Sequence, residues 1–312
     1  MPTRRPPVTD HASRILMEGI VDYAGVYPPA ALDMAVAVRH YAHYRAGGAG
    51  WMLGRFVCPA SALATFSQLA DPLLPRDAGA IPWRLSVTAS GDIPADLDRM
   101  AAFNERHRVC FEECGAIVDA YDVRVSSAAE LASVNAAIPQ ELVTYLEVPF
   151  AHALDLLPRI AATGRRAKMR TGGVVADAFP STDSIIAFLQ TCIAHSITAK
   201  ATAGLHHALR GAYRLTYDAA APTGSMFGYV NVFLAAALLA NGEDAALAAQ
   251  LLEESDPTTL SIDEVQVSWR SATGIITLDR ALLQRVRETL LVSFGSCSFT
   301  EPVDDLKTLG WM

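Results

Sequence analysis

The stretch AKMRTGG, residues 167–173, has the form of a short β-strand that ends in a turn. Small or apolar residues alternate with two cations and two glycines follow, which is typical of a strand entering a loop. Residues two apart share one face of a strand, so Lys168 and Arg170 are expected to point together, with Ala167 and Met169 on the opposite face. The sequence thus predicts a strand with two cations on one side.

Seven other short apolar or β-branched runs are similar, and helical patterns separate most of them. With 167–173 as the sixth, the predicted strands are Gly19–Gly25, Trp51–Val57, Trp83–Ala89, Ala116–Val123, Leu142–Val148, Thr198–Gly204 and Leu291–Phe299. The predicted helices are Met34–Tyr44, Ala95–Arg106, Ser127–Ala136, Ala151–Ala162, Thr182–His195, Asp279–Leu290 and Pro302–Leu309. Eight such repeats in 312 residues predict one α/β domain over residues 1–312, a (β/α)8 TIM barrel of parallel strands.

The interval between the seventh and eighth predicted strands is too long for one helix. It contains two helical runs, Asn231–Ala240 and Ala245–Leu252, and a further segment, Asp256–Trp269. We therefore predict a seventh helix plus a helical insertion at about residues 208–278, serving as a lid or as an oligomer contact.

Composition limits the partners of this chain. The formal net charge is -8 and no basic stripe carries interleaved aromatic residues, so a nucleic-acid partner is not expected. The longest apolar run, Asn231–Ala240, is shorter than the roughly 20 residues that span a bilayer. Residues 1–14 contain arginines and prolines without an apolar segment after them, which indicates a loose arm and not a signal peptide. We expect a cytoplasmic homo-oligomer without a membrane partner.

The cysteines do not form a disulfide pattern. Their number is odd and their positions are scattered: Cys58, Cys110, Cys114, Cys192 and Cys297. Cys110 and Cys114 are spaced to share a helix face, but no second pair of ligands is nearby, so free thiols are expected and a zinc site is not.

Charged residues fall on the inward face of several predicted strands. The same parity places Arg55, Arg84, Asp119, Glu147 and Lys200 on the same side as Lys168 and Arg170. Active sites of such barrels lie at the carboxyl ends of the strands, and unpaired charge inside a barrel costs several kcal/mol. Structural ion pairs are the alternative, but so many acids and bases together favour an active site.

Two lysines on neighbouring strands indicate amine chemistry. A second cation destabilises an ammonium group, so the pKa of Lys168 is expected to be lowered by Lys200, which leaves a free amine to attack a carbonyl group. Glu147 or Asp119 is expected to move protons during Schiff-base formation. Lys168, Lys200, Glu147 and Asp119 are therefore the predicted catalytic residues, and no cofactor is required.

These motifs resemble the class I aldolases, most nearly deoxyribose-phosphate aldolase. Lys168-Met-Arg-Thr171-Gly172 is similar to the Lys-x-x-Thr-Gly motif of that family, whose lysine forms the Schiff base, and Lys200-Ala-Thr-Ala-Gly204-Leu is similar to its Lys-Ala-Ser-Gly-Gly-Ile motif. Gly295-Ser296-Cys-Ser is similar to the family's Gly-Thr-Ser-Ser phosphate loop, and Val118-Asp119 and Leu146-Glu147 resemble its proton-relay positions. The resemblance implies a carbon–carbon lyase in which Thr171, Gly172, Gly204, Gly295 and Ser296 contact the substrate.

Departures from the family's pattern leave the substrate open. Arg170 stands where the family has a small residue, Ala203 replaces a glycine, and His206-His207 replace an Arg-Thr pair. Arg170 suits a carboxylate or a phosphate, so the expected substrate is a small anionic carbonyl compound such as a sugar phosphate or a keto acid. Arg55, Arg84 and His206 complete the predicted substrate-binding set.

Three other interpretations compete with this one. The first is a metal-dependent lyase, isomerase or hydrolase that uses Glu147 and His206, with Asp119 or Asp22 as a further ligand. The second is a non-catalytic barrel that binds an anionic metabolite. The third is a nucleophilic Cys297 paired with His206, for which the sequence offers no third orienting group.

Overall fold

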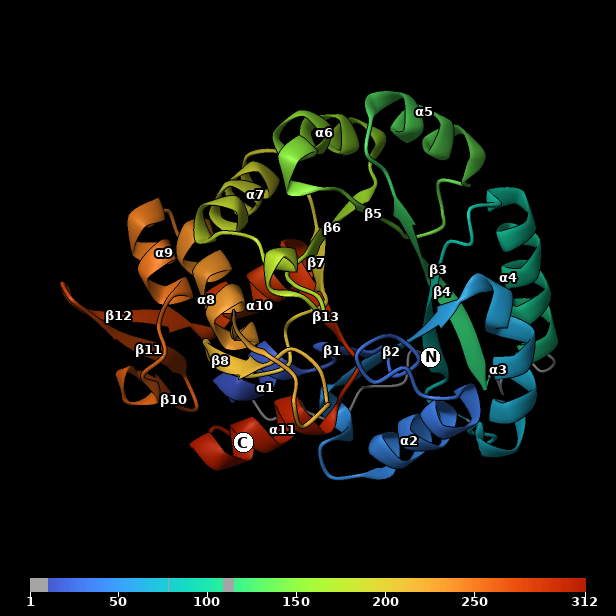
Figure 1. Ribbon diagram of the computed structural model, residues 1–312, viewed down its shortest axis with the longest axis horizontal. Coiled ribbons are helices and arrows are strands. Elements are labelled where there is room, and N and C mark those ends of the chain that lie inside the picture. The colour runs from blue at the N-terminus through green and yellow to red at the C-terminus, as the bar shows by residue number, and fades with distance from the viewer. Residues whose placement is uncertain (1–10, 78, 109–114) are drawn as a thin grey trace.

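Eight parallel strands close into a barrel in the computed structural model, which describes residues 11–77, 79–108 and 115–312 (Figure 1). Around the barrel the order is β1-β13-β7-β6-β5-β4-β3-β2. The strands are β1 (Val21–Tyr23), β2 (Leu53–Pro59), β3 (Trp83–Thr88), β4 (Ala116–Arg124), β5 (Thr144–Glu147), β6 (Arg166–Arg170), β7 (Ala199–Thr202) and β13 (Leu291–Ser296). The predicted TIM barrel is confirmed.

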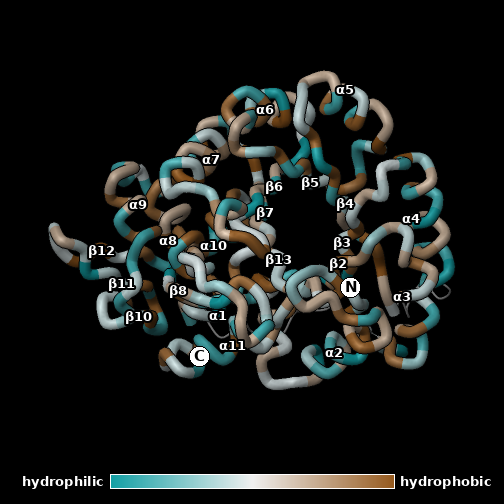
Figure 2. The backbone as a smooth tube through the Cα atoms, viewed as in Figure 1, coloured by the Kyte–Doolittle hydropathy of each residue, from teal (hydrophilic) through white to brown (hydrophobic). Residues whose placement is uncertain are grey.

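Helices surround the strands. They are α1 (Ala12–Met17), α2 (Met34–Ala46), α3 (Leu63–Ala70), α4 (Ile93–His107), α5 (Ala128–Ala137), α6 (Phe150–Thr163), α7 (Thr182–Ala194), α8 (Tyr229–Ala240), α9 (Ala245–Leu252), α10 (Arg280–Thr289) and α11 (Thr300–Leu309). Figure 2 shows hydrophilic and hydrophobic stretches alternating along the outer helices, as is expected when one face packs on the barrel. Side-chain caps set several starts: Ser127 accepts a hydrogen bond from the Glu130 amide and Asp279 from the Leu282 amide.

The connection from β2 to β3 contains a helix that the sequence did not reveal. It is α3, only eight residues long, with Leu63, Phe66 and Ala70 buried against the barrel. Its apolar residues cover barely two turns, which is too short a window for a clear helical period.

The region between β7 and β13 contains strands as well as helices, so the prediction of a helical insertion was wrong. Besides α8 and α9 it contains a hairpin of β8 (Gly211–Arg214) and β9 (Thr223–Met226). It also contains an antiparallel sheet of β10 (Leu260–Ile262), β11 (Gln266–Ser271) and β12 (Gly274–Asp279), which projects with α9 from one side of the ring in Figure 1. Buried residues alternate with more exposed ones along β11, the period of a strand with one covered face.

Helix α8 is the most deeply buried helix of this region. Every residue from Tyr229 to Leu239 is buried, and α8 lies against α7, α9, α10 and β13. A helix that is apolar on all sides belongs between other elements. Helix α8 therefore takes the place predicted for the seventh barrel helix.

Some sequence-based expectations concern residues outside the described ranges. Most of the N-terminal arm and both Cys110 and Cys114 lie there. Within the described ranges, no helix combines the length and the hydrophobicity needed to cross a membrane.

Candidate active site

A cavity of about 770 Å³ lies at the carboxyl ends of the barrel strands. Asp122, Glu147, Lys168 and Lys200 contribute to its lining. Residues nearer the carboxyl ends of the same strands line it as well. The β8–β9 hairpin adds Arg214 and Tyr217 from the region between β7 and β13. The barrel thus supplies charged residues from its strands, and the hairpin covers part of the opening.

The two predicted lysines are neighbours inside this cavity. Lys168 on β6 and Lys200 on β7 are paired across the strands and are only 6% and 2% exposed. The Lys168 Nζ donates to Asp122 Oδ2 at 3.1 Å and lies 3.2 Å from Glu147 Oε2. Their position therefore agrees with the parity argument.

One carboxylate joins the two amines. The Lys200 Nζ lies 2.9 Å from Asp122 Oδ1 and 3.7 Å from Asp22 Oδ2, and it donates to Ser86 Oγ at 3.0 Å. Asp122 therefore bridges Lys168 and Lys200. Asp122 was not among the predicted site residues, because it lies three residues beyond Asp119 and strict alternation places it on the opposite face of the strand.

The carboxylates reverse the expected shift of the lysine pKa. Burial alone lowers the pKa of Lys168, but the charges of Asp122 and Glu147 outweigh burial and raise it above its ordinary value. Burial likewise opposes the charged form of Asp122, yet Lys168 and Lys200 lower its pKa. We predicted that Lys200 lowers the pKa of Lys168. The structure contradicts this, because each of the two amines faces a carboxylate.

Asp119 does not lie with the lysines. The pairing of β3 with β4 passes from Leu85–Val118 to Ser86–Ala120, so Asp119 is the extra residue of a β-bulge. It accepts two hydrogen bonds from Arg55, at 2.6 and 3.2 Å, and also pairs with Arg84. These three residues lie toward the amino ends of β2, β3 and β4 and do not line the cavity. The predicted sites at Asp119, Arg55 and Arg84 are corrected accordingly, and Asp122 takes the place foreseen for Asp119.

Three of the predicted substrate contacts, Thr171, Gly172 and Gly204, hold two loops together. The Thr171 hydroxyl donates to the Ala203 carbonyl at 2.6 Å. A Cβ on Gly204, whose φ is +75°, would lie 2.7 Å from the Gly172 Cα, so the close approach of the two loops at this point requires glycine. Gly204 and Gly295 line the cavity, whereas Thr171, Gly172 and Ser296 do not.

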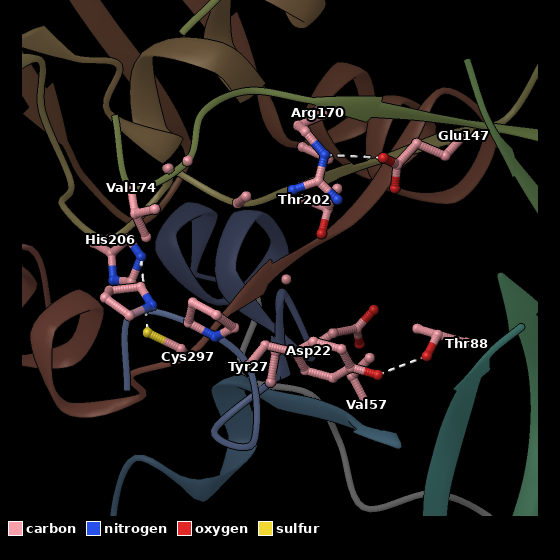
Figure 3. Close-up of a pocket in the computed structure, with 18 of the residues that line it drawn as sticks. Asp22, Tyr27, Val57, Thr88, Glu147, Arg170, Val174, Thr202, His206 and Cys297 are labelled. Atoms are coloured by element: carbon pink, nitrogen blue, oxygen red, sulfur yellow. Dashed lines mark hydrogen bonds and ion pairs between the residues drawn. The ribbon is translucent and has the colours of Figure 1, made fainter. Parts of the chain in front are cut away.

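Arginines stand around the cavity opening. Arg170 donates to Glu147 Oε1 at 2.9 Å, and its side chain is half exposed (Figure 3). With Lys168, Arg170 outweighs burial and lowers the pKa of Glu147. Arg124, the last residue of β4, and Arg214 also line the cavity, and neither is paired with a carboxylate among the described residues. Arg170 was among the predicted substrate-binding residues, whereas Arg124 and Arg214 were not.

A second group of polar side chains lies on another side of the cavity. His206 Nδ1 is 2.9 Å from Glu301 Oε2, and His206 Nε2 is 4.0 Å from the Cys297 Sγ (Figure 3). Tyr217 donates to the same Glu301 oxygen at 3.0 Å and lies 3.5 Å from the sulfur. Burial works against the charged imidazole, but Cys297 and Glu301 raise the pKa of His206 to about 9.

The residues proposed for a metal site do not converge. Glu147 is engaged by Lys168 and Arg170, whereas His206 is engaged by Glu301. Within residues 11–77, 79–108 and 115–312 there is no group of three histidine, cysteine, aspartate or glutamate side chains with a metal-binding arrangement.

Comparison with known proteins gives one result. No protein-family model matches the chain, and no curated protein matches it. The chain is similar to a solved structure described as "Unique tetrameric structure of deoxyribose phosphate aldolase from Aeropyrum pernix". The identity is 15% and the TM-score 0.40, over 65% of this chain and 87% of that chain. This is a resemblance at the level of the fold.

Proposed function

We propose that this protein is a carbon–carbon lyase in which Lys168 forms a Schiff base with a small anionic carbonyl compound. The observation that carries the proposal is the position of Lys168, buried at the cavity with two carboxylates within 3.2 Å of its amine and a second lysine on the next strand. Such a cluster supplies a nucleophile together with groups that accept and return protons.

The use of lysine in this chain supports an amine role. Lysine and arginine number 25 together, and only Lys168, Lys200 and Lys307 are lysines, which leaves 22 arginines. Two of these three lysines are buried side by side at the cavity. Arginine pairs with carboxylates at least as well as lysine does, but it does not lose its proton in proteins, so only lysine provides an amine nucleophile.

Proton movement within the cluster precedes attack on the substrate. The Lys168 ammonium gives a proton to Glu147, and its nitrogen then bonds to the carbonyl carbon as the carbonyl π bond opens. The oxygen becomes a hydroxyl group by taking a proton from that nitrogen. That hydroxyl leaves as water with a proton returned by the carboxyl group, which forms the iminium ion. The bond between the α and β carbons then breaks, its electron pair forms an enamine, and the β-hydroxyl gives its proton to the Glu147 carboxylate as the second carbonyl product leaves. Protonation of the enamine by that carboxyl group and hydrolysis of the resulting iminium ion release the first product and free Lys168. Lys200 holds Asp122 ionised throughout.

The opening suits an acidic substrate. Arg124, Arg170 and Arg214 line the cavity, and two of them are free of ion pairs among the described residues. Arginine binds carboxylate and phosphate groups through two parallel hydrogen bonds. Sugar phosphates and keto acids both meet this requirement.

Reductive trapping tests the proposal. The protein is incubated with a panel of sugar phosphates, simple aldehydes and 2-keto acids, reduced with borohydride, and mapped by peptide mass. We expect a reduced adduct on Lys168, with Lys307 on α11 as the internal control because it is exposed and away from the cavity. The same treatment of Lys168→Arg is expected to give no adduct in the barrel. Absence of a Lys168 adduct with every compound, or labelling of Lys307 alone, would contradict the proposal.

One observation favours a second candidate function, an anion-binding barrel without turnover. The raised pKa of Lys168 keeps its amine protonated, as a counter-charge requires. This candidate predicts that a sugar phosphate or keto acid raises the melting temperature without forming a reducible adduct.

A further inference from the structure

Cys297, His206 and Glu301 come from three separate segments and meet at the cavity. Cys297 follows β13, His206 follows β7, and Glu301 lies in the first turn of α11. The thiol is buried yet belongs to the cavity lining, so a bound ligand reaches it from within the pocket. The proposed lyase chemistry at Lys168 does not use these residues.

Their order is that of a nucleophile, an imidazole and an orienting carboxylate. Glu301 holds His206 Nδ1 at 2.9 Å, which directs Nε2 toward the sulfur 4.0 Å away. His206 Nε2 faces the sulfur, so the imidazole is placed to take the thiol proton and to return it. The Tyr217 hydroxyl, which donates to Glu301, lies 3.5 Å from the same sulfur.

We propose that Cys297, His206 and Glu301 form a second nucleophilic site in the cavity, at which the thiolate of Cys297 adds reversibly to the carbonyl carbon of a small aldehyde. A sulfur–carbon bond forms as the carbonyl π bond opens, and the oxygen takes a proton from His206 Nε2. The product is a neutral thiohemiacetal, and the reverse path restores aldehyde, thiolate and imidazolium. Only the choice of an aldehyde rests on the proposed function; the nucleophilic site does not.

The same molecule contains matched controls. His207 Nδ1 lies 3.1 Å from Asp305 Oδ2, but its ring stacks on Tyr213, and none of the thiols that the structure describes lies against it. Cys58 and Cys192 are buried free thiols whose pKa values burial raises to about 12, and neither lines the cavity. They report the behaviour of a thiol without an imidazole partner.

Alkylation kinetics test the nucleophile without any substitution. The intact protein is treated with iodoacetamide and each cysteine peptide is followed by mass. We expect Cys297 to react at least about tenfold faster than Cys58 and Cys192. Equal or slower reaction of Cys297 would overturn the proposal, and this comparison does not depend on whether a variant folds.

Substitutions test the role of the partners. We expect Glu301→Gln to slow alkylation of Cys297 several-fold and Asp305→Asn to leave it unchanged. In a titration followed by nuclear magnetic resonance, the imidazole pKa of His206 is expected near 9 and is expected to fall in Cys297→Ser. A purely structural contact would leave the alkylation rate and the titration unmoved in these variants, and that result would reject the triad.

Glycolaldehyde identifies the electrophile. We expect it to slow iodoacetamide labelling of Cys297 in the wild-type protein and equally in Lys168→Arg, which has no Schiff-base amine. No protection, or protection that disappears in Lys168→Arg, would reject aldehyde addition at Cys297. Borohydride trapping at Lys168 is read separately, so failure of the lyase proposal and failure of this one are distinguishable.

Discussion

The two ends of the barrel interior contain clusters with similar charges and different chemistry. Toward the amino ends of the strands, Asp119 is shared by two arginines, Arg55 and Arg84. Toward the carboxyl ends, Asp122 is shared by two lysines, Lys168 and Lys200. Each cluster thus joins one aspartate from β4 to two cations from other strands. Only the second lines the cavity.

The difference shows why charge alone does not define an active site. Arginine holds a carboxylate in place through a planar fork and keeps its proton, so the amino-end cluster fits a structural tie. Lysine exposes a single nitrogen that becomes a nucleophile once it loses a proton. The comparison therefore predicts that substitutions at the two ends affect different properties of the protein.

The largest expected effect comes from exchanging the two kinds of cation. Lys168→Arg keeps the charge but removes the amine, so adduct formation and turnover are expected to fall by at least about 10³-fold, as when a nucleophile is removed. Arg84→Lys makes the opposite exchange at the amino end. Adduct formation and turnover are expected to stay unchanged in this variant, because Arg84 is half exposed and outside the cavity. Borohydride trapping of both variants measures this, and equal losses would show that the two clusters do not differ in role.

The next effect concerns stability. Asp122→Asn leaves two buried ammonium groups without their shared carboxylate, so the free energy of unfolding is expected to fall by about 3 kcal/mol. Asp119→Asn is expected to cost less, because Arg84 keeps contact with water and Asp22 remains near Arg55. Urea denaturation of the two variants gives the comparison. A larger loss in Asp119→Asn would reverse the ranking of the clusters.

A smaller effect is expected on substrate affinity. Arg170→Ala removes a cation from the opening, and KM for an anionic carbonyl substrate is expected to rise about tenfold, equal to about 1.4 kcal/mol, with less change in kcat. Arg84→Ala is the matched control and is expected to leave KM unchanged. A tenfold rise for a neutral aldehyde in Arg170→Ala would contradict binding of an anionic group by this residue.

The smallest effect is the pH dependence of stability. Asp122 and Glu147 have lowered pKa values, so their contribution is present above the ordinary values of 3.8 and 4.5 and is lost as pH falls through the lowered ones. The pKa of Lys168 is raised, so its contribution is present below the ordinary value of 10.5 and is lost as pH rises through the raised one.

Urea denaturation at acid and alkaline pH measures how the free energy of unfolding falls at each extreme. Each proton that folding excludes adds a slope of about 1.4 kcal/mol per pH unit. Glu147→Gln removes one of the carboxylates, so the free energy of unfolding of this variant is expected to fall less steeply with decreasing pH than that of the wild-type protein. The same fall in the variant as in the wild-type protein would show that folding does not lower the pKa of Glu147.

Much of the barrel followed from the order of the residues. Runs such as 167–173 and Thr198–Gly204 have the period of a strand, and their regular alternation with helices leaves few topologies besides a barrel. The pairing of Lys168 with Lys200 followed from parity, because β6 and β7 are regular and adjacent. The short helix α3 and the sheet β10–β12 did not follow, since short or isolated elements take their form from the surface they cover.

The site was predictable only where strand geometry is regular. The β-bulge at Asp119 reverses which face of β4 the following side chains occupy. Asp122 therefore lines the cavity where Asp119 was predicted to do so. Glu301 was not identified, because the turn after β13 and the loop after β7 place it against His206 from 95 residues away.

The sequence by itself determined the alternation of strands and helices, the two lysines on neighbouring strands and an acidic chain with few lysines. Tertiary structure decided which carboxylate faces each amine, the direction in which the pKa of Lys168 moves, and the meeting of Cys297, His206 and Glu301. The physical reason is that periodicity acts over a few residues, whereas charge interactions depend on distances of a few ångströms between segments far apart in the chain.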